Sequence, residues 1–146
     1  MMNAVNNLEE RRAPLKLVKC SKEYWEFVRQ LRNDERIQGG FIEQVQISPE
    51  QQISYMSLHE SNYFVCLSYN EPVGYVGVIE GDIRICTSPK FQQQGIASFM
   101  LSEIMKLFPD AHGKVKINNS ASRNLFKKLG FEETFIIYTR SSSKNR

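Results

Sequence analysis

The stretch Thr87-Ser88-Pro89-Lys90-Phe91-Gln92-Gln93-Gln94-Gly95-Ile96-Ala97 joins two segments of different pattern. Residues 83–87, ahead of it, have the composition of a strand, and residues 96–108, after it, have the apolar spacing of a helix. The turn between them therefore ends at a helix N-terminus, where the first four backbone amides lack partners within the helix. Because the helix dipole adds about half a positive charge there, such an end favours a phosphate or pyrophosphate ligand.

Two small residues, Gly95 and Ala97, stand in this turn. Because glycine has no side chain, the backbone at Gly95 can come close to a bound ligand. The alternative interpretation is structural, since a glycine also lets a strand turn sharply into a core helix. The turn alone does not decide between the two.

Two motifs in the second half of the chain resemble those of one enzyme family. Gln92-x-x-Gly95-x-Ala97 is similar to the (Arg/Gln)-x-x-Gly-x-(Gly/Ala) motif of the GCN5-related N-acetyltransferases, the GNAT family, and the preceding Thr-Ser-Pro-Lys-Phe is similar to its Val-x-Pro-x-Tyr. The family's second segment is resembled by Asn119-x-x-Ser122-x-x-Leu125-x-x-Lys128-Leu129-Gly130-Phe131. The first half of the chain matches only in its pattern of elements. With both motifs in register, the ligand-binding interpretation is favoured.

The resemblance implies an α/β (α+β) GNAT fold, in which a central, mostly antiparallel mixed sheet of about six to seven strands is flanked by about four helices. We expect residues 1–146 to form a single N-acetyltransferase domain, ordered over about 14–140, with flexible tails at 1–13 and 141–146. The residue patterns predict strands at 15–20, 63–69, 72–79, 83–87, 115–117 and 131–140. They predict helices that begin near Ser21, Ser48, Ile96 and Asn119, with a capping box formed by Ser48 and Gln51.

Composition excludes several classes of protein. The net charge is +3, of which Lys144 and Arg146 supply two, so nucleic-acid binding by bulk charge is not expected. The three cysteines, Cys20, Cys66 and Cys86, are far apart in the sequence, and we interpret them as reduced core residues of a cytoplasmic protein with no metal site. No apolar run reaches the length of a membrane span, and residues 1–14 lack a signal-peptide core, so no membrane partner is expected.

By the resemblance, the donor is acetyl-coenzyme A (acetyl-CoA). The amides of residues 93–98 would hold its pyrophosphate, the strand before the turn would pair with the pantetheine arm, and the amide of Thr87 would polarise the thioester carbonyl. Asn119 would hydrogen-bond the pantetheine or acetyl region. The expected cofactor-binding residues are Ile85, Cys86, Thr87, Gln92, Gln93, Gln94, Gly95, Ile96, Ala97, Ser98, Asn119 and Ser122.

The catalytic groups are less closely defined. Phe126 stands where many family members carry the tyrosine that protonates the departing thiolate, which leaves Ser122, Asn124 or water, and we favour Ser122. A carboxylate near the start of the central strand often acts as the base, and Glu80 and Asp82 are the candidates. Their alternative interpretation is as residues of a Glu-Gly-Asp turn.

On the acceptor side, Phe41 either lines a substrate pocket or anchors a loop. Arg84 lies in a mostly apolar strand, where a charge needs a partner, so it either pairs with Asp82 or Glu80 or binds an anionic part of the acceptor. Leu31-Arg32-Asn33 resembles the family branch that includes ribosomal-protein and nucleotide-sugar acetyltransferases.

The expected function is transfer of an acetyl group from acetyl-CoA to a primary amine of a small molecule, by direct attack in a ternary complex. An amino sugar or nucleotide-linked amino sugar is one interpretation of that acceptor. The alternatives are acetylation of a protein N-terminus or lysine, a non-catalytic acyl-CoA-binding module, and a general nucleotide-phosphate binder, the last weakened by the lack of a phosphate-loop motif. Both a monomer and a homodimer are compatible with the sequence.

Overall fold

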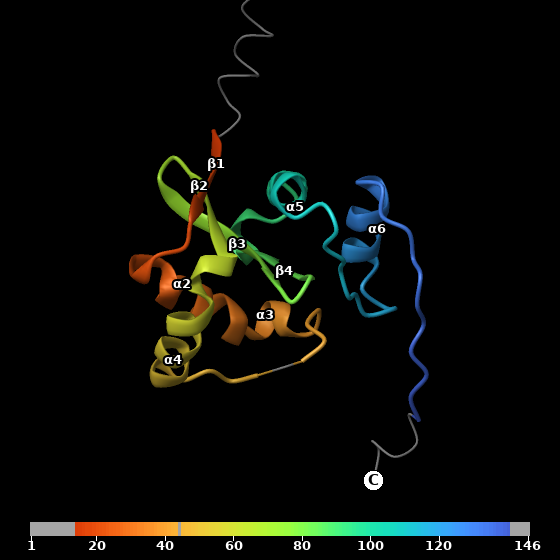
Figure 1. Cartoon of the computed structure of the whole chain (residues 1–146), viewed down its shortest axis with the longest axis horizontal. Helices are drawn as coiled ribbons and strands as arrows, with labels where there is room; N and C mark the ends of the chain where they lie inside the picture. Colours follow the sequence, from red (N-terminus) through yellow and green to blue (C-terminus); the bar gives the residue numbers. More distant parts are fainter. Residues whose placement is uncertain (1–13, 44, 141–146) are drawn as a thin grey trace, which may run out of the picture.

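The computed structural model describes residues 14–43 and 45–140, so the predicted tails at 1–13 and 141–146 lie outside the described residues. Its strands and helices are arranged as Figure 1 shows. The strands are β1 (Leu15–Lys19), β2 (Tyr63–Ser68), β3 (Glu71–Ile79) and β4 (Asp82–Thr87). The α-helices are α2 (Lys22–Asn33), α3 (Glu35–Gln38), α4 (Pro49–His59), α5 (Ile96–Leu107) and α6 (Ser120–Lys128).

The four strands form one antiparallel sheet in the order β1-β2-β3-β4. Two tight turns produce the β2–β3 and β3–β4 hairpins. Tyr69 and Asn70 have φ of 49° and 64°, and Glu80 and Gly81 have φ of 51° and 80°. Two consecutive residues of positive φ define the turns whose twist matches that of paired strands, so these turns set the register at the start of both hairpins, and the β2–β3 register shifts once, between Cys66 and Leu67.

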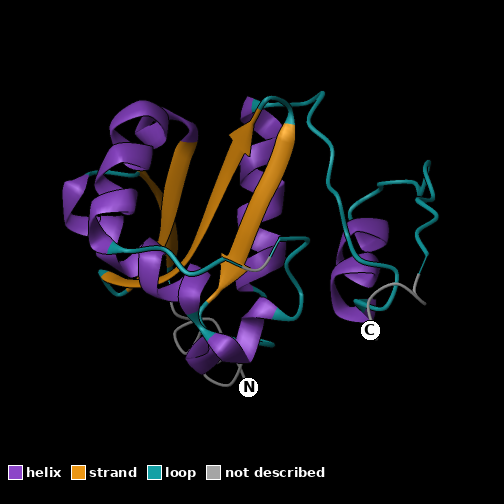
Figure 2. Ribbon diagram, turned by 90° about the horizontal axis from the view of Figure 1, so that it is seen from below, coloured by secondary structure: helices purple, strands orange, loops and turns teal. Residues whose placement is uncertain are grey.

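Helices cover both faces of the sheet (Figure 2). Because successive strand residues point to opposite faces, Val65 and Tyr75 pack with α2 and α4, while Cys66 and Val76 pack with α5. Both sets are buried, so β3 is buried along most of its length. The second core depends on a fully buried row of α5 that contains Met100, Leu101 and Ile104.

Local capping agrees with the sequence at one helix and differs at another. The hydroxyl of Ser48 accepts a bond from the Gln51 amide (3.1 Å) and the Gln51 side chain accepts one from the Ser48 amide (2.8 Å), which confirms the predicted capping box. Ser21 occupies the N-cap position of α2, but its hydroxyl donates to the Glu23 carboxylate (3.2 Å) and caps no amide of the described residues. The position of that cap is right, and its predicted bond is absent.

The predicted sheet of six to seven strands is not confirmed, because the described residues contain four, with five α-helices beside them. The strand predicted at 115–117 is not formed, and the nearest pairing in the described chain is one parallel bridge between Asp82 and His112. The amide of Ile83 donates to His112 (2.8 Å), and the amide of His112 donates to Gly81 (2.8 Å). The chain then leaves the sheet edge, with Lys116 Nζ bonded to the carbonyl of Gly39 (3.0 Å).

The last predicted strand, 131–140, is also not formed in the described part of the chain. Glu133 is held on α6 by Arg123 (2.8 Å) and Lys127 (3.3 Å). Beyond this anchor the segment runs past α6 in extended form, with no strand of the described ranges beside it (Figures 1 and 2). The residues have the composition of a strand, but the described chain places no second strand next to them.

The glycine at position 77 lets an aromatic ring lie against the sheet. A Cβ built there would lie 2.6 Å from the ring of Tyr63, which is the cross-strand neighbour of Gly77. The missing side chain at Gly77 therefore allows β2 and β3 to pair with this ring lying over Gly77. Arg84 is the neighbour of Gly77 on the other side, so Tyr63 and Arg84 flank a position without a side chain.

Replacing Gly77 by alanine should lower the free energy of unfolding by about 1–3 kcal/mol, because the new methyl group overpacks the Tyr63 ring. Urea denaturation followed by circular dichroism measures it. Gly39→Ala is the matched control, since a Cβ there meets nothing within 4 Å and its φ is −57°. Equal stability of the two variants would show that the ring moves aside without cost.

Candidate functional site

The turn that leads into α5 has an open, uncapped helix end. Gly95 is the N-cap residue with φ of 79°, and no side chain of the described residues caps the helix there. A Cβ built at Gly95 would meet nothing within 4 Å. Glycine is therefore favoured by its left-handed backbone, and the space outside the helix end is open. The glutamines of the turn, Gln92, Gln93 and Gln94, are exposed.

The outer edge of β4 offers backbone groups next to this helix end. The Ile83 amide points away from β3, because it bonds His112. Since the direction alternates along an antiparallel strand, Ile85 and Thr87 also point outward, while Cys86 pairs with Tyr75 of β3. Two of the three residues expected to pair with a pantetheine arm thus face outward, and the third faces the sheet.

The Cys86 side chain lies in the core, as predicted for all three cysteines, which are free and buried. Burial raises the pKa of its thiol to about 12, and the thiol donates only a weak bond to the carbonyl of Thr87 (3.7 Å). A neutral thiol is a poor nucleophile, so Cys86 is unsuited to covalent catalysis. The buried hydroxyl oxygen of Thr87 has no hydrogen-bond partner among the described residues.

A cavity of about 230 Å³ opens between β4, the loop before α4 and the start of α6. It combines aromatic and charged side chains from segments far apart in the sequence. Its lining residues include Arg32, Gly40, Phe41, Glu43, Tyr63, Tyr75, Asp82, Arg84, Ile85, Lys114, Asn119, Ser122 and Phe126.

Asp82 and Arg84 form an ion pair at this cavity. The Oδ2 atom of Asp82 accepts from Nε of Arg84 at 2.9 Å, and the Asp82 side chain is 14% exposed. Its second oxygen, Oδ1, is buried and has no hydrogen-bond partner among the described residues. Glu80 lies in the β3–β4 turn and is not among the lining residues. The structure thus separates the two carboxylates that the sequence left as alternatives.

At the start of α6, Asn119 and Ser122 face the same cavity. Asn119 Oδ1 accepts from the Ser122 amide (3.2 Å) and caps the helix. Its Nδ2 lies toward Gly40, where an added Cβ would be 3.0 Å away. Phe126, one turn further on, is buried, and a Cβ at Gly113 would overlap its ring. Phe126 therefore packs against the backbone at Gly113 and forms part of the cavity wall. Its side chain has no proton to donate.

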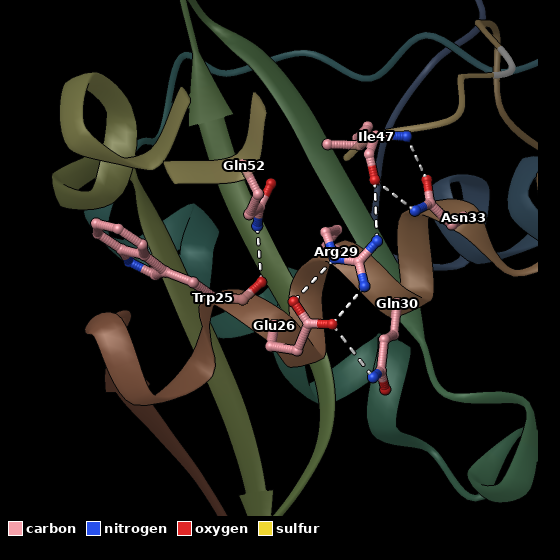
Figure 3. Close-up of polar contacts among 7 residues, drawn as sticks. All are labelled: Trp25, Glu26, Arg29, Gln30, Asn33, Ile47 and Gln52. Carbon is pink, nitrogen blue, oxygen red and sulfur yellow. Dashed lines mark hydrogen bonds and ion pairs between the residues drawn. The ribbon is translucent and has the colours of Figure 1, made fainter. Parts of the chain in front are cut away.

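The loop that carries Phe41 is tied to α2. Asn33 both donates to and accepts from the backbone of Ile47 (2.8 Å each), and Arg29 donates to the same carbonyl (3.0 Å; Figure 3). Gln38 adds bonds to the carbonyls of Arg32 (3.0 Å) and Val45 (2.7 Å). These bonds fix both ends of the loop, and they hold the half-buried Phe41 at the cavity.

Some lining residues were not identified from the sequence, namely Arg32, Tyr63, Tyr75 and Lys114. Tyr63 and Tyr55 share a hydroxyl hydrogen bond (2.7 Å), and burial raises the pKa of Tyr63 and of Tyr75. The hairpin register places Tyr63 of β2 opposite Gly77 of β3, and Gly77 lies opposite Arg84 of β4. That shared neighbour is the signal by which Tyr63 could be assigned to the cavity. The signals for Arg32 and Lys114 needed tertiary contacts, because both lie outside the sheet.

Two further observations concern the described residues as a set. No cluster of three or more histidine, cysteine, aspartate or glutamate side chains in the described ranges has a geometry that suits a metal ion. Within the same ranges, no helix has both the length and the apolar character that a membrane crossing requires.

The chain matches the family described as "Acetyltransferase (GNAT) domain" over residues 59–133. That range contains β2 to β4, the turn, α5 and α6. The chain belongs to the GNAT acetyltransferase family, and the resemblance drawn from its two motifs is confirmed. No curated protein sequence matches it.

Solved structures show the same fold at low sequence identity. Spermidine N-acetyltransferase from Vibrio cholerae, in complex with CoA and spermine, is 19% identical with a TM-score of 0.74, over 83% of this chain and 82% of that one. Ribosomal-protein-alanine N-acetyltransferase from Brucella melitensis is 16% identical with a TM-score of 0.71, over 82% and 86%. Aminoglycoside N-acetyltransferase AAC(6')-Iy, in complex with CoA, is 17% identical with a TM-score of 0.66, over 90% and 97%.

The buried Cys86 thiol should make stability fall at alkaline pH. Its pKa rises from 9.0 to about 12 on folding, so the unfolded chain loses its proton first as the pH increases. The stabilisation is complete below pH 9 and is lost between pH 9 and 12, at up to ~1.4 kcal/mol per unit. Urea denaturation of the wild type and of Cys86→Ala at several pH values measures the difference, and identical pH dependence of the two would contradict the burial.

Proposed function

We propose that this protein transfers the acetyl group of acetyl-CoA to a primary amine of a small molecule. The observation that carries the proposal is the continuity of three features: the uncapped N-terminus of α5, the outward-facing edge of β4 at Ile85 and Thr87, and the cavity that begins at Ile85. A long ligand with a pyrophosphate at one end and a reactive group at the other suits this path. Solved relatives that carry CoA support the choice of ligand.

The residues present fit the donor in three ways. The first amides of α5 would hold the pyrophosphate, and the open space at Gly95 leaves room for it. Ile85 and Thr87 have backbone groups free to pair with an amide-containing arm. Asn119 Nδ2 is available to donate to that arm, since its Oδ1 is the atom that caps α6. When bound, acetyl-CoA supplies the activated thioester.

Asp82 is the base that the geometry favours over Glu80. An acceptor amine enters as an ammonium group, and it must lose a proton before its nitrogen can form a bond to the acetyl carbon. Asp82 lines the cavity, and its buried Oδ1 has no partner among the described residues, so the proposed route takes that proton to this carboxylate, directly or through water. The C–S bond then breaks and the departing sulfur must gain a proton; Ser122 is the proposed donor, because the neighbouring Phe126 has none, and the second proton lost by the acceptor nitrogen would restore its hydroxyl.

The charges of the cavity favour an acceptor that carries an anionic group. Three cationic side chains, Arg32, Arg84 and Lys114, line it beside only two carboxylates, Glu43 and Asp82, among the described residues. A polycationic amine would be repelled by this balance, whereas a nucleotide-linked amino sugar offers both an amine and a diphosphate. Arg84 is the proposed contact for the anion, since its side chain is 43% exposed while bonded to Asp82.

Placing a negative charge at the α5 terminus should weaken donor binding. We expect Gly95→Asp to weaken CoA binding by at least about tenfold relative to Gly95→Asn, because both side chains tolerate the left-handed backbone while only aspartate repels the pyrophosphate. Thermal-shift titration with CoA, acetyl-CoA, ATP and NAD measures it, and saturation at a hundred times Kd should add about 2.7 kcal/mol of stability.

If neither CoA form stabilises the wild-type protein, the proposed function fails. If both do, but no amine in a library releases free thiol, the protein is a non-catalytic CoA-binding module. Release of thiol with peptides alone would move the acceptor to a protein N-terminus or lysine. Stabilisation by ATP without CoA would assign the turn to a different nucleotide.

Removing the Ser122 hydroxyl should lower kcat by about 100-fold while CoA binding stays within about threefold, since proton transfer contributes at least this much. Ser120→Ala is the matched control, because Ser120 lies on the same first turn of α6 and is not among the residues that line the cavity. Steady-state kinetics of thiol release give kcat for both variants. An unchanged kcat in Ser122→Ala would assign protonation to water.

A further inference from the structure

One tyrosine outside the cavity contacts two residues that line it. Tyr55 lies on α4, which packs beside α2 (Figure 1), and it is not among the lining residues. Its hydroxyl shares a hydrogen bond with the hydroxyl of Tyr63 (2.7 Å), and the guanidinium carbon of Arg32 lies 5.2 Å from the centroid of its ring. Tyr63 begins β2 and Arg32 lies in the last turn of α2, so Tyr55 connects these two elements at the cavity.

The pair of hydroxyl groups leaves one hydrogen without an acceptor. Each tyrosine hydroxyl has one hydrogen to donate and can also accept. The bond between Tyr55 and Tyr63 uses one of the two hydrogens, and neither hydroxyl makes another hydrogen bond within the described residues. Tyr63 is only 2% exposed, and the large majority of buried polar side-chain atoms have a partner. Because Tyr63 lines the cavity, its hydrogen is available to a bound molecule whenever Tyr55 is the donor within the pair.

Two guanidinium groups lie near the Tyr63 hydroxyl. Burial raises the pKa of Tyr63, and the positive charges of Arg32 and Arg84 oppose that rise. Arg84 is bonded to Asp82, whereas Arg32 forms no ion pair with a carboxylate of the described residues. Arg32 is half-buried, and the ring face of Tyr55 attracts its charge without neutralising it. A negatively charged group in the cavity would therefore meet a donor hydroxyl and two cations.

A purely structural role for Tyr55 is the alternative interpretation. Its ring contacts the rings of His59 (4.6 Å between centroids) and Tyr63 (6.1 Å), and the helix dipole alone would favour Arg32 at the C-terminus of α2. These contacts explain an aromatic ring and a cation at these places. They do not explain a buried pair of hydroxyls, because phenylalanine at both positions would keep the ring contacts and leave no unpaired hydrogen.

We propose that Arg32, Arg84 and the Tyr63 hydroxyl form a binding site for an oxyanion, and that Tyr55 is the positioning residue of this site. The oxyanion is a carboxylate or phosphate group of the acceptor, so the inference rests on the proposed function and narrows its acceptor to an amine that carries such a group. Tyr55 donates to Tyr63, Tyr63 donates to the oxyanion, and the ring of Tyr55 supports Arg32. Guanidinium groups suit this ligand, because their N–H groups match the geometry of carboxylate and phosphate.

The proposed role of Tyr55 differs from a structural one in a measurable way. Its hydroxyl acts on the oxyanion only through the hydroxyl of Tyr63. Removing it should therefore weaken anion binding while Tyr63 is present, and should have no further effect once Tyr63 has been replaced by phenylalanine. Two residues that stabilise the fold independently would show additive effects instead.

Binding of inorganic phosphate and of acetate to the CoA-saturated protein tests the site without an acceptor. CoA is added first so that the donor site is occupied, and isothermal titration calorimetry gives the dissociation constant of each probe. We expect Tyr63→Phe to raise the constant of the preferred probe by at least about tenfold, because a bond to a charged group is lost. Tyr55→Phe should raise it by about threefold, and the double variant should match Tyr63→Phe within about twofold. The tighter of the two probes identifies the oxyanion as phosphate or carboxylate.

Tyr24→Phe is the matched control, because Tyr24 is a half-buried tyrosine packed against the same core, and its hydroxyl has no hydrogen-bond partner among the described residues. It should leave both constants unchanged within about twofold, and circular dichroism shows whether each variant is folded. CoA binding without binding of either probe to the wild type overturns the inference and leaves the donor site intact, whereas a lack of CoA binding overturns the proposed function and the inference with it. Probe binding that Tyr63→Phe does not change, or an effect of Tyr55→Phe that is absent or equal in both backgrounds, also overturns the inference.

Discussion

The candidate site depends on backbone hydrogen bonding along the outer edge of β4, which is present at Ile83 and absent beyond it in the described chain. Two bonds join Gly81 and Ile83 to His112 at the start of β4, and past them the chain after His112 leaves the edge. If the ladder continued, the outward groups of Ile85 and Thr87 would be used within the protein. Because it stops, the edge of β4 stays available to a ligand, and the cavity begins at the same place. The same bridge therefore joins the segment after α5 to the sheet and leaves the rest of the β4 edge open.

The opposite wall of the cavity depends on the hairpin and on α2. Gly77 of β3 leaves room for the Tyr63 ring on β2, and Arg84 of β4 flanks Gly77 on its other side. The bonds from Asn33 and Arg29 to Ile47 tie the Phe41 loop to the helix that contains Arg32. A shift of α2 would therefore move an aromatic and a cationic residue of the cavity together, since both are attached to the same helix.

Local signals in the sequence predicted the elements whose partners are adjacent in the chain. The β2–β3–β4 hairpins, the Ser48 capping box and the turn into α5 all involve residues within a few positions of each other, and the two motifs were sufficient to identify the family. The predictions of strands at 115–117 and 131–140 were wrong for the described chain, because their partners would have to come from distant parts of the sequence. Strand composition describes a residue's preference for a pleated surface, but a strand exists only if a second strand lies beside it.

The residues that line the cavity divide in the same way, into those that local sequence signals identified and those that only the tertiary fold brings there. Asp82, Arg84, Asn119, Ser122 and Phe41 were identified from turns, motifs and a charge in an apolar strand, and all five line the cavity. Arg32 and Lys114 lie on segments that only the tertiary fold brings together. The sequence also left Glu80 and Asp82 as alternatives, because two residues of one turn cannot be distinguished until the direction of each side chain is known.

If Asp82 is the base, as proposed, its arrangement would link acceptor binding to proton transfer. Its Oδ2 is occupied by Arg84, while Oδ1 is buried and unpartnered among the described residues. An acceptor with an anionic group would compete for Arg84, and each bond that Arg84 gives to the acceptor is one that it withdraws from Asp82. Oδ2 would then be released, and both oxygens of the carboxylate would be open to the ammonium group of the acceptor. An acceptor without the anion would leave Oδ2 bonded to Arg84, so under the proposed mechanism the ion pair can discriminate between amines by how far each one draws Arg84 away from Asp82.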